Sequence, residues 1–245
     1  MRHRCYVAIV TVTLLTTVAA ADTKIVHKTH QDAFTVMGQT QPATDAERVT
    51  WLGDGRMRVD AGTTTYIVRL DSSTLFLIDH EARTVSSVEL PVDIVRLLPE
   101  GMAEQMRAMM HFDFEVASTD ETKQVGEWTA RRWNMTMTSP MVTVENALWA
   151  TTDLDVDHEA YVRLFGQIAA LQPGMEGQLE KLRSIDGFVV ETQSTTRITG
   201  ESEGAMTWTE QAVSVETAEP PAGAYDPPAN YEKREFDLMA SLQRR

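Results

Sequence analysis

The chain has 245 residues, and its 22 Lys and Arg against 36 Asp and Glu give a formal net charge of −14 at pH 7. A surface this acidic repels phosphate backbones and anionic lipid headgroups, so neither a nucleic-acid partner nor a basic membrane-binding patch is expected. The single cysteine, Cys5, excludes a disulfide within the chain.

The first 21 residues have the three parts of an export signal in the required order. Residues 2–4 (Arg-His-Arg) form a basic start, residues 6–18 form an apolar run, and residues 19–21 are three alanines suited to cleavage. The run is shorter than the roughly 20 apolar residues of a membrane-spanning helix, so we expect a cleaved signal peptide and no stable membrane anchor. Cys5 precedes the run, whereas a lipoprotein signal places its cysteine after it.

Cleavage near Ala21 leaves 224 residues without cysteine, a size typical of one β-rich domain. The signal peptide carries two arginines and no acid, so its removal shifts the net charge from −14 to −16. Thiolate catalysis and cysteine metal sites are excluded for this product. We therefore expect a single domain over residues 22–245, located in the periplasm of a bacterium or secreted from it.

Short strand signals separated by turn residues dominate residues 24–90. The strand signals are rich in Val, Ile, Thr and aromatic residues, and the breaks between them, such as Gly53-Asp54-Gly55, are of turn type. Gaps this short join antiparallel neighbours, because a parallel crossover needs a dozen or more residues. The pattern predicts a meander whose five clearest strands are 47–52, 56–60, 64–70, 74–78 and 83–90.

The middle of the chain predicts a short helical part followed by a second group of strands. Pro91 ends the meander, residues 93–98 resemble a helical turn, and residues 102–110 have helical periodicity. The strand signals that follow are 112–116, 123–127, 130–137 and 142–151.

The last third of the chain predicts two helices and a hairpin. An apolar stripe on Tyr161, Phe165 and Ile168 indicates the first helix, and a second is expected from Pro173 until Gly187 stops it. Strands 188–198 and 205–216 form the hairpin, and the proline-rich tail is expected to lie extended across the domain. The fold class predicted is α+β, with one large antiparallel sheet of about ten or eleven strands and helices on one face.

Five segments together resemble a family of bacterial exported proteins that carry a domain of unknown function. They are WLGDGRMRVD at 51–60, LFLIDHEARTVSSVELP at 75–91, ALWATTDLDVD at 147–157, DGFVVET at 186–192 and PAGAYDPPANYEK at 221–233. The resemblance implies the lipoprotein-carrier fold of the LolA and LolB type, an incomplete barrel whose concave face is closed by helices. Some relatives bind acyl chains in that hollow, and the resemblance brings no catalytic residues with it.

Two motifs resemble a catalytic serine site and a calcium-binding loop, but the residues around them exclude both. Residues 200–204 match G-x-S-x-G around Ser202, but polar hairpin strands flank them and no histidine follows His158, so we expect a hairpin turn. The acidic run 153–157 resembles the start of a calcium loop, but His158 and Leu164 occupy the positions of its Gly and Glu. Asp157 is better explained as a helix N-cap.

His27 and His30 are the third candidate, for a metal site. Their spacing of three places them on opposite faces of a strand, so they cannot grip one ion. We expect solvent-exposed or edge histidines. No metal and no other cofactor is predicted.

The methionines and aromatic residues are the candidate lining of an apolar site. Methionine side chains can repack around variable apolar partners, which suits a binding site for apolar ligands. An ordinary core explains such apolar stripes equally well. A Cu(I) site is disfavoured, because the methionines have no accompanying cysteine or well-placed histidine. The predicted ligand-binding residues are Met102, Met106, Met109, Trp133, Met135, Trp149 and Phe165. In this prediction the methionine helix is a lid over the sheet.

The function expected from these patterns is that of a non-catalytic binding or carrier protein for an apolar small molecule or lipid. The alternative is an interaction or scaffold domain of the cell envelope, with a protein partner and a hollow filled by its own side chains. A carrier needs an apolar cavity of about 300–1,000 Å³, whereas a scaffold has a closed core. An enzyme is disfavoured because the catalytic motifs fail.

Overall fold

The computed structural model describes residues 21–36, 38–93, 97, 112–172, 175–199 and 205–238. The predicted signal peptide lies outside the described residues apart from Ala21, and so do the predicted helix 102–110 and the segment 200–204.

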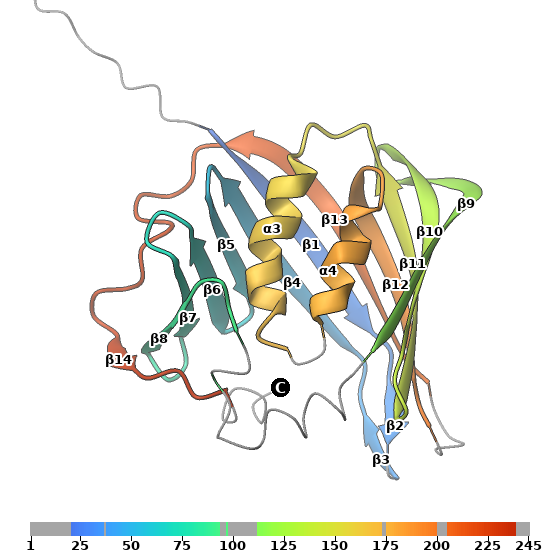
Figure 1. The fold of residues 1–245 in the computed structure, drawn as a ribbon, viewed down its shortest axis with the longest axis horizontal. Coiled ribbons are helices and arrows are strands. Elements are labelled where there is room, and N and C mark those ends of the chain that lie inside the picture. The colour runs from blue at the N-terminus through green and yellow to red at the C-terminus, as the bar shows by residue number, and fades with distance from the viewer. Residues whose placement is uncertain are drawn as a thin grey trace, which may run out of the picture.

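One large curved sheet of twelve strands forms most of the molecule (Figure 1), in the order β14-β8-β7-β6-β5-β4-β1-β13-β12-β11-β10-β9. Two further strands, β2 (Phe34–Val36) and β3 (Gln39–Gln41), form a separate hairpin. The strands of the large sheet are β1 (Asp22–Gln31), β4 (Thr44–Gly53), β5 (Arg56–Ala61), β6 (Thr64–Arg69), β7 (Thr74–Asp79), β8 (Thr84–Glu89), β9 (Asp113–Val125), β10 (Trp128–Thr138), β11 (Val142–Thr151), β12 (Phe188–Ile198), β13 (Met206–Ala218) and β14 (Glu232–Arg234).

The sheet confirms the predicted meander and corrects the predicted class. Strands β4 to β8 pair in chain order as antiparallel neighbours, because the two- to four-residue turns between them allow nothing else. The sheet has twelve strands where about ten or eleven were expected, and it is not closed into a barrel. The described chain is mostly β rather than α+β, since two helices of 12 and 8 residues accompany this sheet.

Strand β9 differs from its prediction because two expected strands, 112–116 and 123–127, form one strand of 13 residues. The polar residues between them suggested a break, but they remain in register with β10 through a bulge between Arg131 and Trp133. A bulge absorbs an extra residue and keeps a long strand paired.

Strand β1 occupies the centre of the sheet. It pairs with β4 on one side and with β13 on the other, both antiparallel. It thereby joins the meander β4–β8 to the second group of strands, β9–β13. At the far edge, β14 pairs with β8 in parallel.

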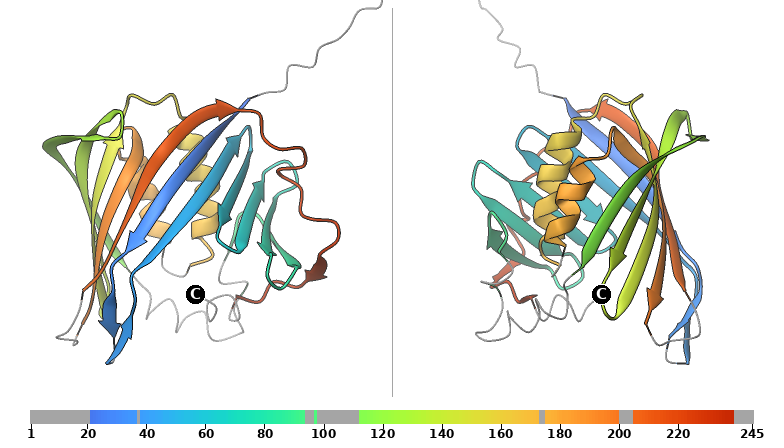
Figure 2. Two further views of the ribbon diagram at one scale, coloured as in Figure 1. Left: turned by 180° about the vertical axis from the view of Figure 1, so that it is seen from behind. Right: turned by 45° about the vertical axis from the view of Figure 1, so that its right-hand side comes forward.

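Two helices, α3 (His158–Ala169) and α4 (Glu176–Arg183), lie side by side over the concave face of the sheet (Figure 2). The Asp157 carboxylate accepts a hydrogen bond from the Ala160 amide at 2.8 Å, which confirms the predicted N-cap of α3. The helices pack closely, because a Cβ placed on Gly166 would lie 2.9 Å from Cδ1 of Leu179.

Each helix covers a different half of the sheet. Helix α3 and the turn after it contribute Leu164, Ile168 and Leu171 to a buried cluster with side chains from β4 to β8. Leu182 of α4, together with Met175 and Ile185 at its ends, packs with the apolar side chains of β9 to β12. On the central strands, Ile25 of β1 and Ala212 of β13 belong to another buried cluster, against which Tyr161 of α3 packs.

The proline-rich C-terminal segment packs on the opposite face of the meander. Ala224 and Tyr225 join Trp51 and Ile67 in a third buried cluster. The Tyr225 hydroxyl donates a hydrogen bond of 2.6 Å to the Asp22 carboxylate, and the Arg56 guanidinium lies 4.5 Å from the centre of the Tyr225 ring. Burial and the Asp22 carboxylate raise the pKa of Tyr225 above its usual range, so the hydroxyl stays protonated and donates. The segment is therefore tied to the start of β1.

Replacing Tyr225 with Phe should lower the free energy of unfolding by about 1–3 kcal/mol, because it leaves the buried Asp22 carboxylate without this donor. Urea titration followed by tryptophan fluorescence measures the loss. The matched control is Tyr231→Phe, which removes a less buried hydrogen bond of 3.1 Å to His80 and should cost less. Equal losses in the two variants would contradict the assigned role of Tyr225.

Candidate functional site

A cavity of about 230 Å³ lies between the helices and the central strands of the sheet. Six strands (β1, β4 and β10 to β13) and both helices contribute to its wall. Most of the wall is apolar, and its apolar and aromatic lining residues are Met135, Leu148, Tyr161, Val162, Phe165, Leu182, Phe188, Val189, Val190 and Trp208.

The polar part of the wall is centred on an ion pair that crosses β1. Arg48 on β4 and Glu210 on β13 lie on opposite sides of β1, and the Arg48 Nη2 to Glu210 Oε1 distance is 2.7 Å. The register places His27 opposite Arg48 and Thr29 opposite Glu210, so the pair passes over β1 between two side chains of the same face. Thr29 Oγ1 also donates to Glu210 Oε2, at 3.5 Å.

Aromatic rings frame this ion pair. Tyr161 and Phe165, one turn apart on α3, stack with ring centroids 5.6 Å apart and an interplanar angle of 6°. Tyr161 meets Phe188 of β12 edge to face, with centroids 5.1 Å apart. Arg48 Cζ lies 5.4 Å from the centre of the Phe165 ring. Burial raises the pKa of the Tyr161 hydroxyl, partly offset by the charge of Arg48, so the phenol stays protonated at neutral pH.

Three buried nitrogen atoms of the lining have no hydrogen-bond partner among the described residues. They are Nδ1 of His27, Nε of Arg48 and Nδ1 of His158. Buried polar atoms in folded proteins are normally paired, so each such atom calls for an explanation. Three side chains around one cavity therefore have hydrogen-bonding capacity that the described part of the chain does not use.

His27 is buried, with 3% of its surface exposed, on the central strand of the sheet. The expectation of a solvent-exposed or edge histidine is therefore wrong for His27, because β1 is paired on both sides and the His27 ring lies beside that of Phe188 of β12, with centroids 6.5 Å apart. Burial, together with the nearby charge of Arg48, lowers the pKa of His27 from 6.5 to about 3. His30 points away from this face as predicted and contacts Asp45 at 2.8 Å.

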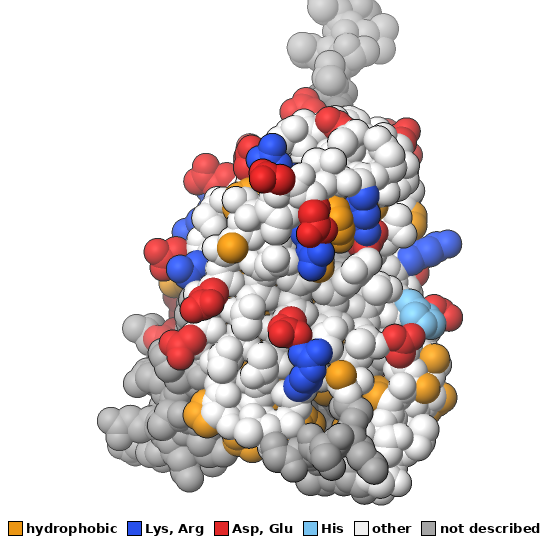
Figure 3. Space-filling model, turned by 90° about the vertical axis from the view of Figure 1, so that its right-hand side faces the viewer, with side chains coloured by type: hydrophobic (Ala, Val, Ile, Leu, Met, Phe, Trp, Pro, Cys, Tyr) orange, Lys and Arg blue, Asp and Glu red, His pale blue; other side chains and the backbone are white. Residues whose placement is uncertain are grey.

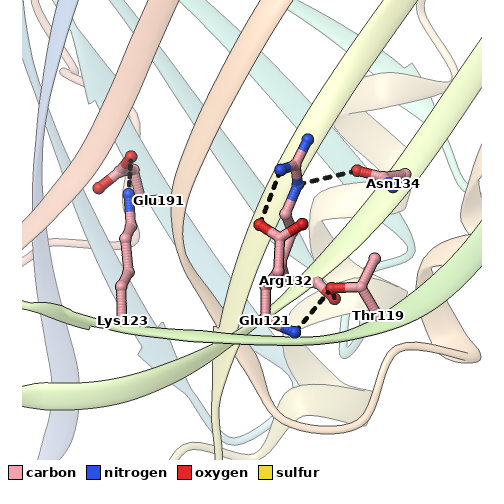
Figure 4. A network of polar contacts seen from close by, with 6 residues as sticks. All are labelled: Thr119, Glu121, Lys123, Arg132, Asn134 and Glu191. Carbon is pink, nitrogen blue, oxygen red and sulfur yellow. Dashed lines mark hydrogen bonds and ion pairs between the residues drawn. The ribbon is translucent and has the colours of Figure 1, made fainter.

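Glu191, the second carboxylate of the lining, is neutralised by a lysine. Lys123 Nζ lies 2.7 Å from Glu191 Oε1 and 4.2 Å from the centre of the Trp149 ring. Figure 4 shows this pair beside a separate contact network on β9 and β10, in which Arg132 reaches Glu121 at 2.9 Å and Asn134 at 3.0 Å. The charges around the cavity therefore occur in balanced pairs.

The residues predicted for the ligand site divide into three groups. Met135 and Phe165 line the cavity. Trp133 packs beside Met135 and Trp149 packs against Phe188 and Val190, but neither tryptophan is part of the lining. Met102, Met106 and Met109, on the predicted helix 102–110, lie outside the described residues. Sequence reasoning missed Arg48 and Glu210 and treated His27 only as a metal candidate, although an arginine at the start of the predicted strand 47–52 was a weak signal for Arg48.

The outer surface over β9 to β11 has interspersed charges of both signs, with hydrophobic side chains in small groups (Figure 3). The large hydrophobic residues most exposed in the described part of the chain are Met141 at 57% and Val213 at 45%. Within the same residues, no three His, Cys, Asp or Glu side chains lie close enough to hold a metal ion. No described helix has the length and apolar character needed to cross a membrane.

No family model and no curated protein matches the sequence. Among solved structures, one described as "Structure of PNGF-II in C2 space group" matches 91% of this chain at 11% sequence identity and a TM-score of 0.41. The chain spans about a third of the length of that protein, at 32%.

The stability of the protein should fall on acidification because of His27. The unfolded chain binds a proton at His27 below pH 6.5 whereas the folded chain does not until about pH 3, so stability is lost as the pH falls through that window. Between pH 7 and pH 5 the loss from this group is about 2 kcal/mol. Urea titrations at the two pH values measure it, and His27→Gln should abolish this component.

The control is His30→Gln, on the exposed side of the same strand. The Asp45 carboxylate raises the pKa of His30, so this group stabilises the fold below pH 6.5 and the stabilisation is lost as the pH rises. Its replacement should make the fall on acidification steeper. If the wild type and His27→Gln had the same pH dependence, the pKa of His27 would be the same in the folded and the unfolded chain, which would contradict the prediction.

Proposed function

We propose that this protein is a non-catalytic carrier that holds the apolar part of a lipid-like ligand between its curved sheet and helices α3 and α4. The observation that carries the proposal is the cavity of about 230 Å³, which has mostly apolar walls and unpartnered nitrogen atoms at one side. Burial of a ligand's methylene groups against such walls supplies the binding free energy, at about 0.8 kcal/mol per methylene.

The size of the cavity limits what it can enclose. Sites for drug-sized ligands measure about 300–1,000 Å³, and this cavity, at about 230 Å³, is smaller. It fits one short acyl segment rather than a whole lipid, with the remainder of the ligand lying outside.

The fold and compartment we propose follow from the sequence. The resemblance of its turn and strand segments to exported bacterial proteins supports a lipoprotein-carrier fold of the LolA type, an incomplete barrel with helices over its concave face. The basic, apolar and small-residue parts of residues 1–21 support export to the periplasm. A carrier in that compartment would have access to lipids and acylated proteins.

A second candidate function, a protein-interaction domain of the cell envelope, is favoured by the packing on both sides of the cavity. Leu164 and Ile168 on one side and Met135 and Leu148 on the other belong to buried clusters that fill most of the space under the helices. In this alternative the cavity is a packing defect and binds nothing.

Binding of fatty acyl probes distinguishes the two functions. The dissociation constant of the wild type should fall about fourfold with each added methylene until the cavity is full. Val189→Phe places a larger side chain on the cavity wall and should weaken binding of a ten-carbon chain at least tenfold. Displacement of the fluorescent probe N-phenylnaphthylamine measures these constants.

The matched control is Val213→Phe, because Val213 is 45% exposed and does not line the cavity. This variant should bind like the wild type, since surface substitutions change stability by only about 0.5 kcal/mol. Affinity that does not depend on chain length, or that survives Val189→Phe, would exclude the carrier function for this cavity.

A further inference from the structure

The polar side of the cavity identifies the chemical group that its ligand carries. Building on the carrier function proposed above, we propose that the cavity recognises the uncharged carbonyl of an acyl ester or amide, whose oxygen accepts a hydrogen bond from Nε of Arg48. The acyl chain then lies along the apolar wall formed by α3, α4 and β10 to β12.

The first argument is a buried donor on Arg48 that lacks a partner. Glu210 holds the Arg48 guanidinium through Nη2 at 2.7 Å, and the Tyr161 hydroxyl is a further hydrogen-bond partner of this side chain. Nε is nevertheless buried without a partner among the described residues. An arginine nitrogen donates hydrogen bonds and never accepts them, so the missing partner is an acceptor. A carbonyl oxygen is such an acceptor, whereas an alkyl chain is not.

The second argument is His27, whose unpartnered Nδ1 belongs to the same lining. The side chain directly faces Arg48 across the β1–β4 ladder and is 97% buried, with 3% of its surface exposed. Its low pKa keeps the imidazole uncharged at neutral pH, and an uncharged imidazole offers one donor and one acceptor. It can therefore contact either oxygen of an ester or the NH of an amide without adding charge.

The third argument is the charge balance, which separates a carbonyl from a free carboxylate. Glu210 neutralises Arg48, and Lys123 neutralises the other carboxylate of the lining, Glu191. A fatty-acid carboxylate entering this site would lose its hydration without gaining an unpaired positive charge, which is strongly unfavourable. A neutral carbonyl loses much less hydration and satisfies the Arg48 donor.

The experiment compares three ligands of similar length on the full exported chain at pH 8. Methyl decanoate, decanoate and dodecane compete for N-phenylnaphthylamine, and methyl decanoate should bind about tenfold more tightly than either of the others. Equal affinities for the three would overturn the carbonyl site and leave the carrier function standing. Failure of all three to displace the probe would overturn the carrier function itself.

Two substitutions test the roles of charge and donor separately. Glu210→Gln keeps an oxygen for Arg48 but removes the balancing charge, so the affinity for decanoate should rise at least tenfold relative to methyl decanoate. Arg48→Lys keeps a charge for Glu210 and removes Nε, so the preference for methyl decanoate over dodecane should disappear.

The matched control for the second variant is Arg69→Lys, at an exposed ion pair with Asp71 and Asp226, which should leave the three affinities unchanged. Near-ultraviolet circular dichroism shows whether each variant is folded, and either folded variant decides the question. An unchanged ester-to-carboxylate ratio in Glu210→Gln, or an unchanged ester-to-alkane ratio in Arg48→Lys, would overturn the proposal.

Discussion

The pairing of β1 with β4 on one side and β13 on the other is the constraint on which the architecture depends. Strand β13 lies more than 170 residues from β1 in the chain, so pairing the two strands closes a long loop. Contacts between neighbouring residues cannot specify this pairing. Without β1, the meander β4–β8 and the group β9–β13 would each have an unpaired edge. The same ladder brings Arg48 and Glu210 together over His27, so the site and the fold share one origin.

The cavity lies under both helices. Helix α3 buries apolar side chains of the meander, and α4 buries apolar side chains of the second group of strands. The cavity wall changes from aliphatic side chains to a charged pair and two histidines. Burying such groups opposes folding unless they are paired, and Nε of Arg48 and Nδ1 of His27 have no partner among the residues that the structure describes. Buried polar atoms without hydrogen-bond partners are a local cost to stability, and such costs are expected mainly at functional sites.

The two faces of the sheet support each other through β1. On the concave face β1 carries His27 beneath the helices, and at its start Asp22 holds the C-terminal segment through Tyr225. The segment also packs on Trp51, the neighbour of the concave Leu52.

The sequence by itself determined the features that depend on near neighbours. The turns of the meander, the N-cap at Asp157 and the bounds of β12 follow from residues a few positions apart, and all were predicted correctly. Met135 and Phe165 could be placed among apolar residues for the same reason. Only the tertiary structure decided the rest. It joined two predicted strands into β9, placed β1 at the centre of the sheet and buried His27 beside the Arg48–Glu210 pair. Polar residues on a strand look solvent-exposed until its partners are known, because burial is set by contacts between segments far apart in the chain.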